Sequence, residues 1–156
     1  MIHNKENALK LYKNRLMSTY EEISAFEEAM ESLYNLENIE NIKYFCNAFD
    51  DRTEEKSVMF SLVHGIENYD NIFGKEMATS KFLDSVEDMA LNAPEWLEIM
   101  ILRILNDNQS RIVFIEQLKN KHYNTKDIIV KIIKNLIQSD FEKFNDSGNE
   151  VLNKIK

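Results

Sequence analysis

Apolar residues recur every three or four positions along most of this 156-residue chain, the spacing of amphipathic helices. The stripe from Glu6 to Leu36 is compatible with one long helix, or with two helices separated at Ser18-Thr19. Further helices are predicted over 39–49, 54–68, 75–92, 94–106, 109–121 and from 125 through 144. Ser147-Gly148 is expected to end the last one, and the residues from about 147 onward to be frayed.

The segment from Pro94 to Asn106 is almost wholly apolar, interrupted only by Glu95, Glu98 and Arg103. Pro94 suits a first helical turn, where its missing N–H costs nothing. A helix with so little polar surface must be enclosed by neighbours on most sides. The pattern therefore predicts a central helix of a layered domain.

Two passages share one design, 45–51 and 101–107. Each is an apolar helix end followed by an acidic turn and an amphipathic helix, which is typical of stacked helical hairpins. With three glycines and one proline the chain also lacks the turn residues that β-sandwiches and barrels need. We expect an all-α fold of stacked antiparallel helical hairpins, HEAT-like, with a plain antiparallel helical bundle as the alternative. The length predicts a single domain over 1–156.

Charge is distributed unevenly along the chain. The total is −8, but residues 20–108 carry −14 while each end carries +3. An acidic middle section of this kind repels phosphates and anionic lipid head groups and attracts basic partners. The alternative interpretation is that these acidic residues form only a solvated surface. Neither nucleic acid nor a membrane is expected as a partner. The N-terminus lacks the apolar core of a signal peptide and no apolar run approaches the length of a membrane span, so the expected location is cytoplasmic.

Motifs of conventional catalysis are not found in the sequence. The three histidines, His3, His64 and His122, form no His-x-x-x-His pair, and the glycines form no phosphate-binding loop. The single cysteine, Cys46, lies in an apolar stretch and is expected to be a buried small hydrophobe with a raised thiol pKa. The sequence predicts a protein that is not an enzyme and holds no cofactor or metal.

One polar set stands out within the apolar pattern. His64 and Glu67 share a helix face, and Arg103 lies in the near-apolar segment. A buried arginine left unpaired would cost several kcal/mol, so we expect Glu67 to pair with Arg103 across two helices. A structural polar cluster is the favoured interpretation, and a catalytic or metal role is the alternative.

A second set consists of acidic residues expected on exposed turns and helix faces. The carboxylates 84, 87 and 88 are predicted to share one helix face, close to 95 and 98 on the next helix. Such a surface could bind the lysines and arginines of a partner. The candidate contact residues are Asp50, Glu54, Glu55, Asp84, Glu87, Asp88, Glu95 and Glu98.

Four passages of the chain, at 49–53, 58–67, 93–96 and 103–107, together resemble an all-helical family of bacterial immunity proteins. The family is catalogued as number thirty among those paired with polymorphic toxins, and the resemblance covers roughly residues 10 to 120. It implies a small cytoplasmic protein that binds the toxic domain of a cognate secreted effector and blocks it. Many such toxins are nucleases with basic clefts, which an acidic protein can cover, and a deaminase, an ADP-ribosyltransferase or a pore former is an equal alternative for the toxin. The matching residues are Asp51, His64, Glu67, Trp96, Arg103, Asn106 and Asp107.

Three other functions stay open on the sequence. A helical adaptor or regulator without a toxin partner would have the same pattern. An enzyme or metal protein would centre on His64 and Glu67. A nucleic-acid binder would use the basic ends, against which the acidic middle argues.

Overall fold

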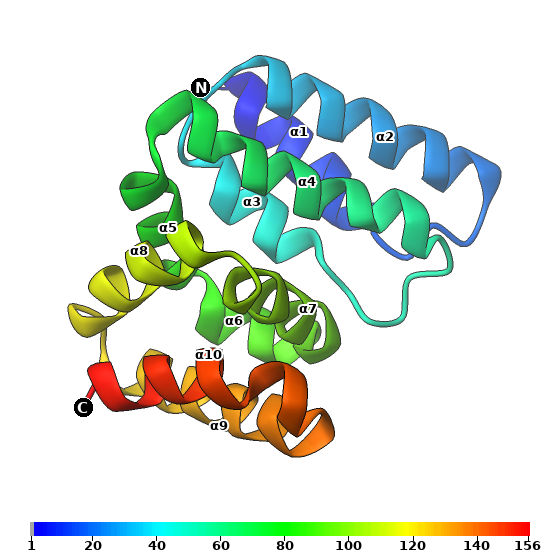
Figure 1. Ribbon diagram of the computed structural model, residues 1–156. Coiled ribbons are helices and arrows are strands. Elements are labelled where there is room, and N and C mark those ends of the chain that lie inside the picture. The colour runs from blue at the N-terminus through cyan, green and yellow to red at the C-terminus, as the bar shows by residue number, and fades with distance from the viewer. Residues whose placement is uncertain (1) are drawn as a thin grey trace.

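The computed structural model describes the backbone of residues 2–156 and the side chains from Asn4 onward (Figure 1). Over this range the chain forms ten α-helices and no strand, which confirms the all-α class. In order they are α1 (Ile2–Lys13), α2 (Tyr20–Asn35), α3 (Asn41–Ala48), α4 (Lys56–Phe73), α5 (Lys75–Asp84), α6 (Val86–Asn92), α7 (Pro94–Leu105), α8 (Asn108–Lys119), α9 (Tyr123–Ser139) and α10 (Phe141–Lys154).

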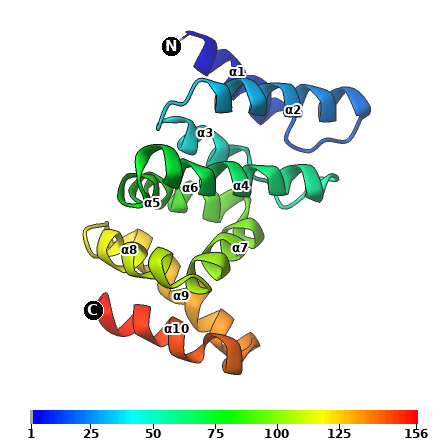
Figure 2. The same cartoon turned by 45° about the horizontal axis from the view of Figure 1, so that its top comes forward.

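Helices follow one another in space in the order of the chain. The α1–α2 hairpin lies at one end, α3 and α4 form the next level, and the α9–α10 hairpin lies at the other end (Figure 2). Between them α5 packs on α4 and α8, and α7 contacts α6, α8 and α9. The HEAT-like classification remains a prediction, and so does the single domain.

The Pro94 helix lies at the centre, as its composition predicts. Pro94 is in its first turn, and five of its side chains are buried. Trp96 lies 5.6 Å from the ring of Phe49 and 5.9 Å from that of Phe60, measured between ring centroids. The helix α7 therefore ties the α3–α4 level to the C-terminal half.

The predicted helix over 75–92 is two helices, because the chain is interrupted at the buried Ser85. The first long stripe is also two helices. Its break falls at Ser18-Thr19, where the Thr19 side chain caps α2 by accepting from the backbone N–H of Glu22.

The expected break at Ser147-Gly148 is wrong. The last stripe is instead interrupted at Asp140, whose side chain caps α10 by accepting from the backbone N–H of Lys143. Gly148 lies inside α10, where a Cβ would stand 2.8 Å from Cδ1 of Ile137 on α9. The glycine thus permits close helix contact rather than ending a helix. In place of a frayed end, α10 continues to Lys154 and buries Val151.

Candidate functional site

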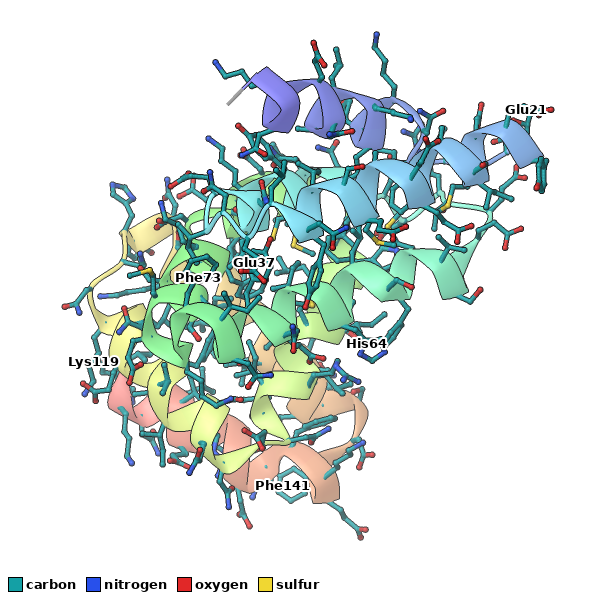
Figure 3. All side chains as sticks on the ribbon, turned by 90° about the horizontal axis from the view of Figure 1, so that it is seen from above. Glu21, Glu37, His64, Phe73, Lys119 and Phe141 are labelled. Atoms are coloured by element: carbon teal, nitrogen blue, oxygen red, sulfur yellow. The ribbon has the colours of Figure 1, made fainter. Side chains whose placement is uncertain are left out.

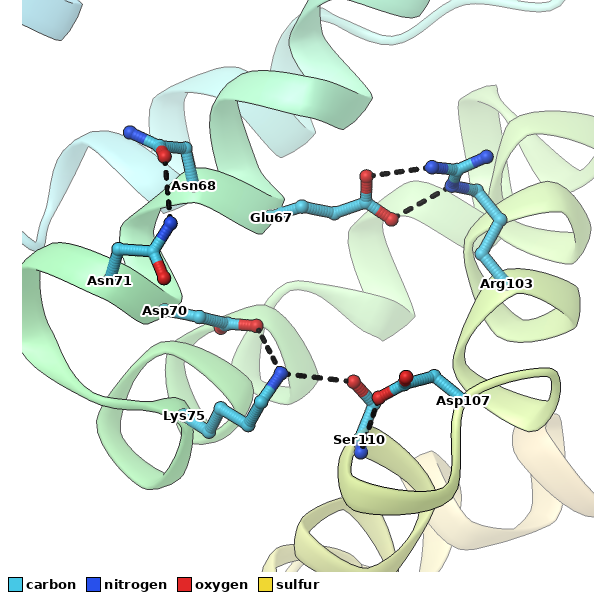
Figure 4. A network of polar contacts seen from close by, with 8 residues as sticks. All are labelled: Glu67, Asn68, Asp70, Asn71, Lys75, Arg103, Asp107 and Ser110. Carbon is cyan, nitrogen blue, oxygen red and sulfur yellow. Dashed lines mark hydrogen bonds and ion pairs between the residues drawn. The ribbon is translucent and has the colours of Figure 1, made fainter.

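A groove of about 480 Å³ lies between α4 and α5 on one side and α7 and α8 on the other. We call it the polar groove, because charged and polar side chains dominate its walls (Figure 4). The charged residues among them are Glu67, Asp70, Lys75, Arg103 and Asp107. Four of the residues that carry the family resemblance, Glu67, Arg103, Asn106 and Asp107, therefore line one groove.

The expected ion pair between Glu67 and Arg103 is present and has two contacts. Arg103 Nε lies 2.8 Å from Glu67 Oε2, and its Nη2 lies 2.9 Å from Oε1. The hydrogen bonds to Glu67 raise the pKa of Arg103. Both side chains are more than a third exposed, so the pair is not the buried one that the sequence suggested. His64 is more exposed still and lies 3.6 Å from the Glu67 carboxylate (Figure 3).

A second chain of contacts crosses the same groove. Lys75 Nζ donates to Asp70 Oδ2 and to Ser110 Oγ, each at 3.2 Å. The Asp107 side chain accepts from the backbone N–H of Ser110 at 2.9 Å and caps α8. Burial raises the pKa of Asp70, whereas the hydrogen bonds from Ser110 lower that of Asp107.

The chemical capacity of the polar groove follows from these pairings. Each of its charged side chains faces an opposite charge or a backbone donor. Lys75 Nζ lies within hydrogen-bonding distance of Ser110 Oγ and is also paired with Asp70. These contacts link α4 and α5 to α7 and α8. Asp70, Lys75 and Ser110 were missed by the sequence interpretation, since nothing in their spacing relates the three.

The side chains from residue 4 onward contain no group of three or more His, Cys, Asp or Glu that could hold a metal ion. Over the same part of the chain, no helix combines the length and apolarity needed to cross a membrane. Cys46 is buried, and burial raises the pKa of its thiol to about 12, as its apolar setting predicts.

Asp50, one of the predicted contact residues, was expected on an exposed turn, and the structure buries it. Its side chain is 2% exposed. Its carboxylate is held by Arg15 Nε at 3.1 Å and Arg52 Nη2 at 2.9 Å. The hydrogen bond from Arg52 lowers the pKa of Asp50, with Arg15 adding to the effect. The carboxylate of Asp50 is therefore already paired within the chain, with the largely buried Arg15 and the exposed Arg52.

Asp51 has a role that its position in the sequence does not suggest. The helix that follows Asp51 in the chain is α4, whose start has no side-chain cap. The Asp51 carboxylate instead accepts from the backbone N–H groups of Glu95, at 3.0 Å, and Trp96, at 3.2 Å. It therefore caps α7, where Ala93 offers no side-chain acceptor.

The other seven predicted acids fall into two groups. Glu54 and Glu55 lie in the loop before α4, and Glu95 and Glu98 lie on the first turns of α7. The Asp51 cap connects this loop to the start of α7. We call these four glutamates the α4–α7 acids. The other three, Asp84, Glu87 and Asp88, do not share one helix face, since Ser85 separates α5 from α6.

Two of those three acids contact other parts of the chain. Lys121 Nζ lies 2.7 Å from Asp84 Oδ1, and Thr125 Oγ1 donates to Glu87 at 3.5 Å. Asp88 lines a separate groove with Tyr12 and Tyr44. The α4–α7 acids are thus the better candidates for binding a basic partner.

Comparison with known proteins gives one match. The family model described as Immunity protein 30 matches residues 13–114, about two thirds of the chain. The matched span includes α2 through α7, the walls that α4, α5 and α7 give to the polar groove, and the α4–α7 acids. Searches of curated proteins and of solved structures returned no match.

Proposed function

The chain belongs to the Immunity protein 30 family, and we propose from that premise that it neutralises a cognate toxin domain by binding it stoichiometrically. The observation that carries the proposal is the family match over residues 13–114. The polar groove is compatible with it, because its charged side chains form ion pairs with one another. The protein acts in this account as a folded, unreactive shape.

The toxin surface that it covers is proposed to be basic. Residues 20–108 carry a net charge of −14, and this stretch holds the α4–α7 acids. Glu54, Glu95 and Glu98 are exposed, whereas Glu55 is half-buried at the start of α4. Carboxylates on an exposed rim accelerate encounter with a cationic partner and set its orientation. A toxin that handles nucleic acid would offer such a partner surface.

Co-expression with a candidate cognate toxin domain tests the proposal. Cells that carry both genes are expected to survive, and the two purified proteins to elute together as a complex of one to one. Death of those cells, with both proteins present in soluble form, would contradict it.

The double variant Glu95→Lys/Glu98→Lys tests the charge argument. Rim charges act mainly on the association rate, so association is expected to slow and the salt dependence of binding to change. The matched control is Glu142→Lys/Asp146→Lys on α10, which changes the charge equally on a helix outside the matched span. Equal association rates for the two double variants would refute the assignment of the α4–α7 acids.

A further inference from the structure

Gly65 is a glycine that the fold does not require. It lies in the middle of α4, where glycine is less favourable than alanine because it loses more backbone freedom on folding. A Cβ at this position would meet only the Tyr34 ring, at 3.7 and 3.8 Å, which is ordinary van der Waals contact. Its surroundings thus differ from those of Gly148, where a Cβ would stand within 3.0 Å of two isoleucines. Closer packing within this chain does not compensate for the stability that a glycine costs at position 65.

The space that Gly65 leaves open is part of a groove. This groove, of about 600 Å³, lies between α2 and α4 and is separate from the polar groove. Met30, Tyr34 and Leu62 supply apolar surface to it. Tyr34 is held in place because its hydroxyl accepts from Asn68 and its ring lies 5.7 Å from that of Tyr69. The apolar floor is therefore formed before any partner arrives.

The α2 side of this groove is acidic. Glu27 and Glu31 stand one turn apart on α2, and both are exposed. Neither has an ion-pair partner among the side chains that the structure describes, in contrast to Glu28, which pairs with Lys10 at 3.3 Å. Two unpaired carboxylates beside an apolar floor fit a segment that carries a cation next to an apolar side chain.

We propose that the α2–α4 groove binds a segment of the toxin polypeptide in which a lysine or arginine stands beside an apolar side chain. The apolar side chain lies over Gly65, and the cation lies between Glu27 and Glu31. This inference rests on the proposed function, and it adds a site that the sequence prediction of partner contacts did not contain. A larger residue at position 65 would fill the floor of the groove.

Two sets of variants test the groove against the purified toxin domain by isothermal titration calorimetry. Gly65→Leu fills the floor and Glu27→Gln/Glu31→Gln removes the charge. Each is expected to weaken binding about tenfold or more. The matched charge control is Glu21→Gln/Glu37→Gln (Figure 3), which is expected to bind within twofold of the wild type. Glu21 lies in the first turn of α2, and Glu37 lies just beyond its C-terminal end.

Thermal unfolding separates a binding role from a structural one. Gly65→Ala is expected to raise Tm by about 2–4 °C, because it adds helix propensity without a clash. A fall in Tm for Gly65→Ala would mean that the glycine serves the fold, and it would overturn the inference. Gly65→Leu must retain the helical circular dichroism of the wild type for its binding result to count, and the Glu27/Glu31 variant tests the same groove without touching α4.

The outcomes distinguish this inference from the function on which it rests. If the wild type binds the toxin and the groove variants bind equally well, the assignment of the groove as a binding site is wrong and the proposed function stands. If the wild type does not bind at all, the proposed function itself fails. If light scattering shows that the wild type alone is a dimer, and Gly65→Leu makes it a monomer, the groove joins two copies of this chain and the proposed occupant is wrong.

Discussion

Asp51 offers the sharpest test of how the fold is held together. The change Asp51→Ala removes both acceptors of the Glu95 and Trp96 backbone N–H groups, 44 and 45 residues away in the chain. Pro94 has no N–H, so these two donors are the ones that a cap of α7 has to satisfy. The variant therefore leaves the start of the central helix without a cap.

The expected loss can be worked from these contacts. Removing a capping side chain costs about 0.5–2 kcal/mol, and removing a negative charge from a helix N-terminus costs about 0.3–1 kcal/mol more. The free energy of unfolding should fall by about 1–3 kcal/mol, a large share of the roughly 5–15 kcal/mol typical of a domain. The Asp51→Asn variant keeps one acceptor and loses the charge. Its free energy of unfolding should therefore lie between those of Asp51→Ala and the wild type.

Urea unfolding measures this loss, followed by the fluorescence of Trp96, the only tryptophan of the chain, and by circular dichroism. Glu98→Ala is the control, because Glu98 is exposed on the same helix and is expected to change the stability by less than about 0.5 kcal/mol. An Asp51→Ala protein as stable as this control would refute the capping role.

Three further predictions concern other contacts. A double-mutant cycle on Glu67 and Arg103 should give a coupling of about 0.5–1 kcal/mol, because both side chains are more than a third exposed; a coupling above about 3 kcal/mol would show a pair that behaves as buried. The pKa of Asp50 is lowered from 3.8, so its contribution to stability is complete above that unfolded value and is lost as the pH falls through the lower folded pKa. Urea unfolding between pH 2 and 7 should therefore show a steeper acid loss for the wild type than for Asp50→Asn, and parallel curves would exclude this linkage. Gly148→Ala should lower the unfolding free energy by about 1 kcal/mol, because overpacking against Ile137 outweighs the gain in helix propensity; a rise in Tm would show that the α9–α10 contact is looser than described.

Local patterns predicted most of the helices, and the reason is visible in the core. Periodic apolar residues become the buried faces, as in α2 and α9. The Glu67–Arg103 pair was predictable too, because a cation in a near-apolar helix requires a carboxylate and Glu67 shares a face with His64. The breaks at Ser85 and Asp140 were not, since neither proline nor glycine marks them and the apolar period continues on both sides.

What the sequence did not reveal depends on contacts between distant residues. Asp50 looks like any acidic turn residue until Arg15, 35 positions away, is seen to pair with it. Asp51 is separated from the helix that it caps by more than forty residues. The α2–α4 groove was not predictable for the same reason, because Glu31 and Gly65 lie on different helices and no local pattern shows that these helices are close.

Titration of the toxin domain's activity with the purified protein tests the central claim most directly. Stoichiometric binding predicts that activity falls in proportion to the protein added and reaches zero at one equivalent, with no dependence on incubation time once binding is complete. Progressive loss of toxin activity at a few hundredths of an equivalent would reveal turnover and contradict the account, as would full activity in the presence of excess folded protein.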